Sequence, residues 1–266
     1  MMDVRVLVPR NRESHTAHRL FDFMEGLRRH GITPTETTDQ TTACDLFVMW
    51  NHRAVRSHAT QRAAGKPYLV LEMGYVGDRF VHTAAGFNGL NGRATFPACL
   101  DSGERWDRLF AQHEREQFDG GDFILLMGQV PGDASIAHVD INEWYRQVVD
   151  AYADSDLPVR FRAHPKADGA RVTGAELIGG DLADAVKSAA FVVTFNSNSG
   201  VDAVLAGRPA ITFDRGAMAW PVTDHRLGEI PVHHDRTAWR NRLAWCQWTS
   251  AELADGSAWE ALKTCL

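Results

Sequence analysis

FVVTFNSNSGVDAVLAGRPAITF (residues 191–213) carries the pattern that decides the fold. Its apolar start predicts a strand over residues 191–197, which runs into Asn-Ser-Asn-Ser-Gly. A helix over residues 200–207 and a second strand over 209–213 are predicted to follow. A linker would explain neither apolar flank. Two strands joined through one short helix are typical of a parallel sheet, so we expect an α/β fold.

The polar loop between the first strand and the helix is predicted to hold an anion. Unpaired backbone N–H groups at a helix start, together with the hydroxyls of Ser197 and Ser199, suit a negatively charged group. Gly200 would let this group approach closely. The alternative is an ordinary helix cap formed by Ser197 or Ser199. The chain has neither a GxGxxG fingerprint nor a Walker loop.

The same alternation of strands and helices extends over the rest of the chain. In the second half, strands are predicted at 122–128 and 159–165, and helices at 141–153 and 181–189. In the first half, strands are predicted at 4–9, 45–51 and 67–75, and helices at 14–30, 56–65 and 104–116. Residues 76–98 show no clear period and are rich in Gly and Asn. An irregular stretch of this length inside a compact lobe is usually functional.

The motif FDGG (residues 118–121) predicts a hinge between two lobes. We expect residues 1–118 to form an N-terminal Rossmann-like acceptor lobe and residues 122–235 a C-terminal Rossmann-like lobe. Residues 236–266 are expected to form a short helical tail. The predicted architecture is therefore α/β, with two lobes and a central cleft.

The composition indicates an ordinary globular protein of 266 residues, with 44% apolar and 23% charged residues. No run approaches the ~18 apolar residues of a membrane span. The first residues lack the apolar core of a signal peptide, so we expect a cytoplasmic protein. The four cysteines show no CxxC spacing and suggest no zinc site; Cys44 and Cys246 are expected to be buried thiols.

Polar residues follow three further predicted strands of the second lobe. His164, Pro165 and Lys166 end the strand 159–165, and ligands in open α/β sheets lie at the carboxyl ends of strands. We therefore expect the His-Pro turn and the Ser197 loop to share one rim and to clamp a diphosphate or a phosphodiester. Other candidates for ligand contact are Gln129, Asp133 and Ser135 after the first strand, and Asp214, Arg215, Trp220 and Pro221 after the last. Trp220 would either stack on a base or cover the core.

The His-Pro strand end, the Ser-Asn-Ser loop and the AGRPAI turn resemble the nucleotide-binding lobe of GT-B glycosyltransferases. The resemblance is to bacterial sialyltransferases and capsule Kdo transferases, and it covers roughly residues 122–225. In those families the two motifs bind the CMP of the donor sugar, which implies donor contacts from His164, Pro165, Ser197 and Ser199 here. Asn198 between the two serines departs from the family pattern, so the phosphate contacts stay open. A UDP-, GDP- or CMP-linked sugar is the implied donor, and we expect no obligatory metal.

Three other segments resemble phage and prophage proteins described as glycosyltransferases: EMGYVGDRF (72–80), GFNGLNGRA (86–94) and RLAWCQWT (242–249). Transfer of a sugar needs a base for the acceptor hydroxyl and positive groups for the departing phosphate. We expect Asp78 or Glu72 to be the base, with Asp78 preferred because its loop is the most irregular. Glu13, His15 and His82 are alternatives to these two carboxylates. The leaving-group role falls to His164, Lys166 and the Ser197–Gly200 donors, with Arg215 as a further candidate.

The charge distribution suggests the acceptor. Residues 1–100 carry 12 Lys and Arg against 9 Asp and Glu, whereas the whole chain has a net charge of −6. This basic lobe favours double-stranded DNA with a hydroxymethylated pyrimidine flipped from the helix. The expected phosphate contacts are Arg10, Arg12, Arg19, Arg53, Arg56, Arg79 and Arg93. A surface saccharide is the alternative acceptor, and a nucleotide-sugar epimerase, a hydrolase or a nucleotide-binding module without chemistry are alternatives to a transferase.

Overall fold

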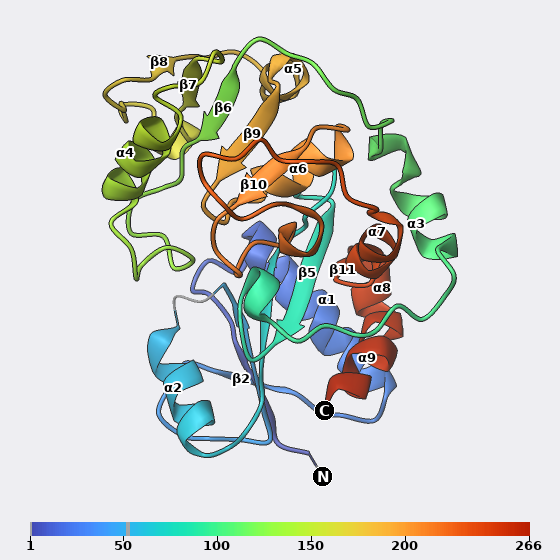
Figure 1. The fold of residues 1–266 in the computed structure, drawn as a ribbon. Helices are drawn as coiled ribbons and strands as arrows, with labels where there is room; N and C mark the ends of the chain where they lie inside the picture. The colour runs from blue at the N-terminus through green and yellow to red at the C-terminus, as the bar shows by residue number, and fades with distance from the viewer. Residues whose placement is uncertain (1, 52–53) are drawn as a thin grey trace. The chain divides into compact units, whose positions relative to one another are not determined.

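The computed structural model describes residues 2–51 and 54–266, and the chain forms two compact units. The first contains Met1–Phe110 and Arg240–Leu266, and the second contains Ala111–Trp239. Each unit has its own β-sheet with helices packed on it, which confirms the expected α/β class with two Rossmann-like units (Figure 1). The division after Phe110 lies before the expected hinge at 118–121, because residues 111–118 pack along the second unit. There the backbone N–H of Phe118 donates to the Gly207 carbonyl over 3.0 Å.

The sheet of the first unit has the strand order β11-β5-β4-β3-β1-β2. Its parallel strands are β1 (Val4–Leu7), β2 (Thr35–Thr37), β3 (Leu46–Trp50) and β4 (Tyr68–Met73). The helices of this part of the chain are α1 (His15–Arg29), α2 (Val55–Ala63) and α3 (Glu104–Leu109). Ser14 caps α1 as expected, since its hydroxyl accepts from the backbone N–H of Ala17. The apolar runs of β3 and β4 are buried on both faces, as is usual in parallel sheets, whereas β1 buries Val4 and Val6 and leaves Arg5 and Leu7 half-buried.

Two strands of this sheet lie where the sequence predicted other structure. β5 (His82–Phe87) falls in the segment expected to be irregular, and β11 (Gln247–Thr249) falls in the tail expected to be helical. β5 pairs antiparallel with both β4 and β11. Its sequence is rich in small residues, and a Cβ at Gly86 would lie 2.7 Å from side-chain atoms of Ala94 and Phe96. Close packing therefore selects residues that show little strand propensity by themselves.

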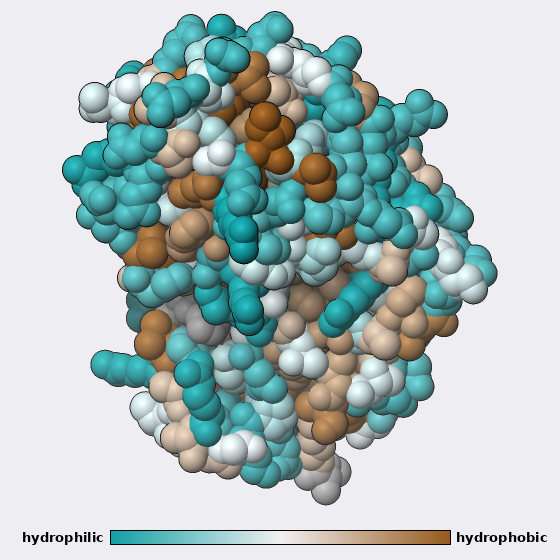
Figure 2. Space-filling model, in the orientation of Figure 1, coloured by the Kyte–Doolittle hydropathy of each residue, from teal (hydrophilic) through white to brown (hydrophobic). Residues whose placement is uncertain are grey.

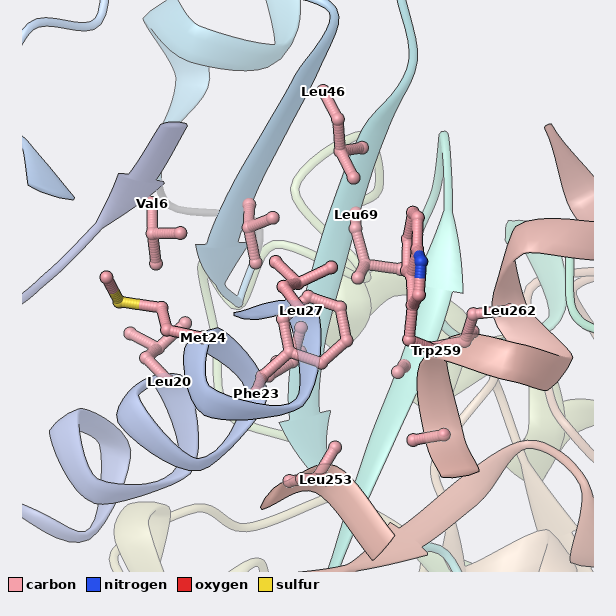
Figure 3. Close-up of a cluster of buried hydrophobic side chains, with 14 of the residues drawn as sticks. Val6, Leu20, Phe23, Met24, Leu27, Leu46, Leu69, Leu253, Trp259 and Leu262 are labelled. Carbon is pink, nitrogen blue, oxygen red and sulfur yellow. The ribbon is translucent and has the colours of Figure 1, made fainter. Parts of the chain in front are cut away.

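The rest of the tail completes the core of the first unit. After α7 (Thr237–Ala244) and β11 come α8 (Ser250–Ala254) and α9 (Ser257–Leu262), which lie along α1 (Figure 1). The Trp259 ring meets that of Phe23 edge-on at 6.1 Å, and a nitrogen of His30 lies 3.0 Å from the Gly256 carbonyl oxygen. Figure 3 shows side chains of α1, of the sheet and of the two C-terminal helices gathered in one cluster. The last residues of the chain therefore belong to the same hydrophobic core as the first.

We expect Gly26→Ala to lower the free energy of unfolding by about 1–3 kcal/mol. In most helix interiors this change stabilises by up to ~1 kcal/mol. Here the added Cβ would overlap the carbonyl oxygen of Leu253 in α8 and lie 3.2 Å from the Gly256 Cα. Urea unfolding measures the difference, and Gly169→Ala, where a Cβ meets nothing within 4 Å, is the control. A Gly26→Ala protein as stable as the wild type would show that α1 and α8 do not touch in solution.

The sheet of the second unit is entirely parallel, in the order β10-β9-β6-β7-β8. Its strands are β6 (Ile124–Met127), β7 (Val159–Arg162), β8 (Glu176–Leu177), β9 (Phe191–Thr194) and β10 (Ala210–Thr212). Its helices are α4 (Ile141–Ala151), α5 (Leu182–Ser188) and α6 (Ser199–Leu205). Asp140 and Asp181 cap α4 and α5, because each carboxylate accepts from two backbone N–H groups. The quoted stretch 191–213 is therefore β9, the polar loop, α6 and β10.

Hydrophilic residues cover most of the face seen in Figure 2, and apolar residues form small separate spots. Within the described ranges, no helix has both the length and the apolarity that a membrane crossing needs. Cys44 and Cys246 are buried, as expected. Burial raises the pKa of both thiols, that of Cys246 to about 12, so they stay protonated and unreactive at neutral pH.

Candidate functional site

The carboxyl edge of the second sheet brings four polar loops together. β6, β7, β9 and β10 are parallel neighbours or near neighbours, so the loops that follow them leave from one edge. Gln129 follows β6, His164 follows β7, Asn196 follows β9 and Asp214 follows β10. The predicted common rim of the His-Pro turn and the Ser197 loop is therefore the rim of this sheet.

Asn196 is the centre of the hydrogen bonds at this edge. It is 3% exposed, and its side-chain oxygen accepts from the Gln129 side-chain amide over 2.9 Å. Its backbone N–H donates to the Gln129 side-chain oxygen over 3.0 Å. Its amide nitrogen donates to the Ser135 carbonyl and to Asp214 Oδ1, over 2.9 and 3.1 Å. One buried asparagine therefore holds three loops in a fixed arrangement.

The predicted residues of the 128–135 segment support this network. Gln129 is buried, and its backbone N–H donates to the Tyr145 hydroxyl over 2.6 Å. Burial raises the pKa of Tyr145, so this hydroxyl stays neutral. Asp133 is exposed and closes a turn, because its carboxylate accepts from the backbone and the hydroxyl of Ser135. Gln129 and Asp133 thus shape the loop.

The Asp214 carboxylate connects the network to the loop after β10. Its Oδ1 accepts from the Gly216 backbone N–H over 2.8 Å, and its Oδ2 lies 3.8 Å from His138 Nε2. Arg215 is exposed beside it. Trp220 stacks on His225, with ring centroids 3.4 Å apart and nearly parallel planes. Trp220 therefore has an aromatic partner within the chain on one of its faces.

The loop 195–200 contains the strongest sign of a ligand. Ser197 Oγ accepts from the Ser199 backbone N–H over 3.3 Å, which folds the loop onto itself. The Ser199 hydroxyl is buried, in a residue only 5% exposed, and has no partner among the residues that the structure describes. A buried hydroxyl without a partner costs about 1–3 kcal/mol. A bound acceptor group would remove this cost.

Gly200 has a packing role that the sequence did not indicate. It is buried, and a Cβ there would lie 2.9 Å from Thr212 Cγ2 and 3.4 Å from Thr194 Cγ2. The tight packing of α6 on β9 and β10 therefore requires a glycine at this position. Asn198 stands at the N-cap position of α6 without a side-chain capping bond, and a helix of seven residues contributes only a weak dipole.

The His-Pro turn fixes one nitrogen of its histidine. His164 caps a short 3₁₀ turn, Pro165–Ala167, and its Nδ1 accepts from the Lys166 backbone N–H over 3.0 Å. In the neutral imidazole, Nε2 then carries the proton and can donate it. His164 is half-buried, and the side chains of Pro165 and Lys166 are exposed. The turn therefore offers a hydrogen-bond donor and a nearby positive charge at the sheet edge.

The expected base candidates belong to the first unit. Glu72 is half-buried near the end of β4, and its Oε1 accepts from the Met73 backbone N–H over 2.9 Å. Asp78 is exposed in the following loop, and its Oδ1 accepts from the Phe80 backbone N–H over 2.9 Å. Glu13 is almost fully exposed at 91%. Of the two histidine alternatives, His15 lies against Phe80 and His82 against Phe110.

Several of the arginines expected to bind DNA phosphates have partners inside the chain. Arg12 pairs with Glu36 over 3.0 Å, and the hydrogen bond with this guanidinium lowers the pKa of Glu36. Arg19 donates to the Phe80 carbonyl over 2.9 Å, and Arg79 donates to the Gly74 carbonyl over the same distance. Of the other expected contacts, Arg10 and Arg56 are exposed. Arg93 interacts with another group of the chain. Arg53 lies outside the described residues.

Sequence reasoning missed Asn196, Tyr145 and His138. Asn196 directly follows the apolar run of β9, so a polar residue at a buried strand end was the available signal. Nothing in the local sequence marks its partners, because they come from other strands. Within residues 2–51 and 54–266, no group of three or more His, Cys, Asp and Glu side chains is placed to hold a metal ion.

Solved structures with a similar fold cover most of the length of this chain. The KpsC beta Kdo 2,4 transferase of Thermosulfurimonas dismutans is 16% identical with a TM-score of 0.61, covering 91% of this chain and 90% of that one. The KpsC beta Kdo 2,7 transferase of the same organism is 14% identical with a TM-score of 0.59, covering 97% and 98%. No known family pattern and no curated protein sequence matches the chain. The similarity confirms the GT-B-like fold of two Rossmann-type units.

Proposed function

We propose that this protein is a glycosyltransferase that takes a nucleotide-activated sugar as its donor and a saccharide as its acceptor. The observation that carries the proposal is the edge of the second sheet. There the buried Ser199 hydroxyl, which has no partner among the described residues, and the His164 imidazole lie in loops that leave the same edge of the sheet. The fold is shared with two Kdo transferases. A CMP-linked sugar is our first choice of donor. The His-Pro and Ser-Asn-Ser motifs resemble the CMP-binding motifs of sialyltransferases and Kdo transferases.

In the proposed reaction, an acceptor hydroxyl oxygen attacks the anomeric carbon of the donor sugar. The bond between that carbon and the phosphate oxygen breaks, and the nucleotide leaves with the bonding electrons. The His164 Nε2–H, the hydroxyls of Ser197 and Ser199, and Lys166 or Arg215 would stabilise the charge that develops on the phosphate. Pro165, Gln129, Asp133, Asn198 and Gly200 would shape the loops that hold these groups.

The proton of the acceptor hydroxyl passes to a base in the first unit, for which we propose Asp78 or Glu72. Asp78 accepts a backbone hydrogen bond at Oδ1, and this bond fixes the direction of its carboxylate. Glu72 is the more buried of the two. Loss of turnover with intact nucleotide binding in Asp78→Asn or Glu72→Gln would identify the base.

A saccharide is a better acceptor for this protein than DNA. The basic balance of the first hundred residues favoured DNA, but Arg12, Arg19 and Arg79 are bonded to partners in the chain. A phosphate backbone would have to displace those bonds. The two solved structures of similar fold are also named as transferases of a sugar, Kdo. The DNA preference therefore receives no support, and we do not retain it.

Thermal unfolding with CMP, UDP, GDP, dTDP and their sugars tests the donor site. A ligand at 100 times its dissociation constant adds ~2.7 kcal/mol of stability. We expect one nucleotide to stabilise the wild type, and His164→Ala to weaken its binding by about 10- to 100-fold, as expected for loss of a hydrogen bond to a charged group. Ser199→Ala should weaken it by about fivefold and leave the ligand-free protein as stable as the wild type or slightly more so.

Ser188→Ala, in an exposed serine at the end of α5, is the control and should bind as the wild type does. Stabilisation by no nucleotide, or equal stabilisation of all variants, would contradict the donor site. Turnover of the nucleotide-sugar without any acceptor, giving an isomeric sugar, would instead identify an epimerase.

A further inference from the structure

Two large apolar side chains are exposed in the loop that joins β4 to β5. Phe80 is 58% exposed and Val81 is 50% exposed. Between them they present one aromatic ring and one branched aliphatic group to solvent. Single exposed apolar residues are common on protein surfaces, so exposure alone does not indicate a site. The hydrogen bonds that hold the backbone of this loop do indicate a site.

The backbone around Phe80 and Val81 is fixed by hydrogen bonds to two residues, Arg19 and Asp78. Arg19 of α1 donates to the Phe80 carbonyl over 2.9 Å and to the Val81 carbonyl over 3.3 Å. Asp78 accepts from the Phe80 backbone N–H at its side chain, and from the Val81 backbone N–H at its carbonyl over 3.0 Å. The Phe80 ring is thus exposed on a backbone whose polar groups are occupied.

The start of this loop is closed in the same way. The backbone N–H of Gly74 donates to the Arg79 carbonyl over 3.0 Å, and the Arg79 guanidinium donates back to the Gly74 carbonyl over 2.9 Å. Residues 74–79 therefore form a closed turn. Its rigidity reduces the conformational entropy that the loop would lose when a ligand binds to the ring.

The Phe80 ring extends an aromatic group at the carboxyl edge of the first sheet. His15, the first residue of α1, lies edge-on to Phe80 at 5.5 Å and to Trp50 at 5.9 Å. Trp50 is the last residue of β3, and the Phe80 loop follows β4, its parallel neighbour. Ligands of open α/β sheets bind at this edge.

We propose that Phe80 is a stacking platform for one sugar ring of the acceptor. The assignment of a sugar rests on the proposed function. A pyranose has an apolar face of C–H groups about as large as a phenyl ring, and hydroxyls around its edge. Phe80 and Val81 match the face, and the exposed carboxylate of Asp78 can accept hydrogen bonds from the hydroxyls. The small apolar area next to charged groups suits a saccharide better than a lipid chain.

Saturation-transfer NMR with methyl glycosides of Kdo, galactose, glucose and N-acetylglucosamine, followed by titration, tests the platform. We expect at least one glycoside to bind the wild type, and Phe80→Leu to weaken it about five- to tenfold, the range expected for loss of an aromatic contact. Phe80→Tyr keeps the ring and should bind like the wild type. Leu100→Ala, at an apolar residue 51% exposed, is the control and should change nothing.

The outcomes separate the platform from the donor site, because nucleotide stabilisation is measured on the same variants. Weaker glycoside binding with unchanged nucleotide stabilisation supports the platform. Equal glycoside binding by the wild type and Phe80→Leu, or no detectable binding of any glycoside to the wild type, overturns it and leaves the proposed function intact. Concentration-dependent dimerisation that Phe80→Leu abolishes would also overturn it, since the surface would then join two copies of the chain.

Discussion

Replacing Arg105 by methionine should lower the free energy of unfolding by about 3–5 kcal/mol, the usual cost of removing one partner of a buried ion pair. Arg105 lies in α3 and is 3% exposed. Its guanidinium pairs with the carboxylate of Glu252 in α8, with one N–H···O distance of 3.0 Å. It also donates to the carbonyls of Ala244 and Gln247 over 2.8 and 2.9 Å.

The surroundings of this guanidinium explain the size of the expected effect. It lies over the rings of Trp248 and Trp245, 4.6 and 5.0 Å from their centroids. Methionine fills much of the same volume but leaves the Glu252 carboxylate and two carbonyls without their donor. Since Ala244, Gln247 and Glu252 all belong to the C-terminal segment, the change loosens the attachment of that segment to α3. Urea unfolding followed by tryptophan fluorescence measures the loss.

Arg108→Met, on the exposed face of the same helix, is the control and should change stability by no more than ~0.5 kcal/mol.

The pH dependence of stability gives a second check of the Arg105–Glu252 pair. Burial raises the pKa of Glu252, but its hydrogen bonds and its attraction to Arg105 outweigh burial and lower the pKa below 4.5. The stability from this pair is therefore complete above pH ~4.5 and lost as the pH falls through the lower, folded-state pKa. Equal stability of Arg105→Met and the wild type at pH 7 would refute the pair.

Gly207→Ala should lower the free energy of unfolding by about 2–5 kcal/mol, from backbone strain and steric overlap together. Gly207 has φ +81°, in the left-handed region. It follows α6 in a Schellman motif: its N–H donates to the Val204 carbonyl and that of Arg208 to the Ala203 carbonyl. A Cβ there would overlap the carbonyl oxygen of Glu116 and lie 2.9 Å from its carbonyl carbon.

The matched control is Gly179→Ala, where a Cβ meets nothing within 4 Å and φ is not left-handed. Its stability should stay within ~0.5 kcal/mol of the wild type. Thermal unfolding of both variants measures the difference. A Gly207→Ala protein with an unchanged melting temperature would show that the segment around Glu116 does not pack against the end of α6.

Much of the fold could be predicted from local sequence. The strands β1, β3, β4, β6, β7, β9 and β10 and the helices α1, α2, α4, α5 and α6 lie within a few residues of the expected ranges. In each case an apolar run or a helical period specifies the element, with caps such as Ser14 at its boundary. The strands β2, β5, β8 and β11 were missed. His82–Phe87 and Gln247–Thr249 become strands through the partners with which they pair.

The candidate site, like the fold, was predicted only in part. The positions of His164 and of Ser197–Gly200 at strand ends followed from the order of strands and helices. The Asn196 network did not, because Gln129, Ser135 and Asp214 are separated from Asn196 by 67, 61 and 18 residues. Their convergence depends on β6 lying beside β9 and β9 beside β10. The occupied donors of Arg12, Arg19 and Arg79 were also invisible in the sequence, which is why charge counting favoured DNA.

The sequence by itself determined the alternation of strands and helices, the two-unit α/β class and the polar loop after β9. These features depend on residues two to four positions apart, so the local sequence pattern is enough to specify them. The tertiary structure alone decided that residues 240–266 complete the first unit, that Arg105 holds them there, and that Asn196 joins three loops. Those contacts join residues far apart in the chain, and such partners are selected only when the whole core closes.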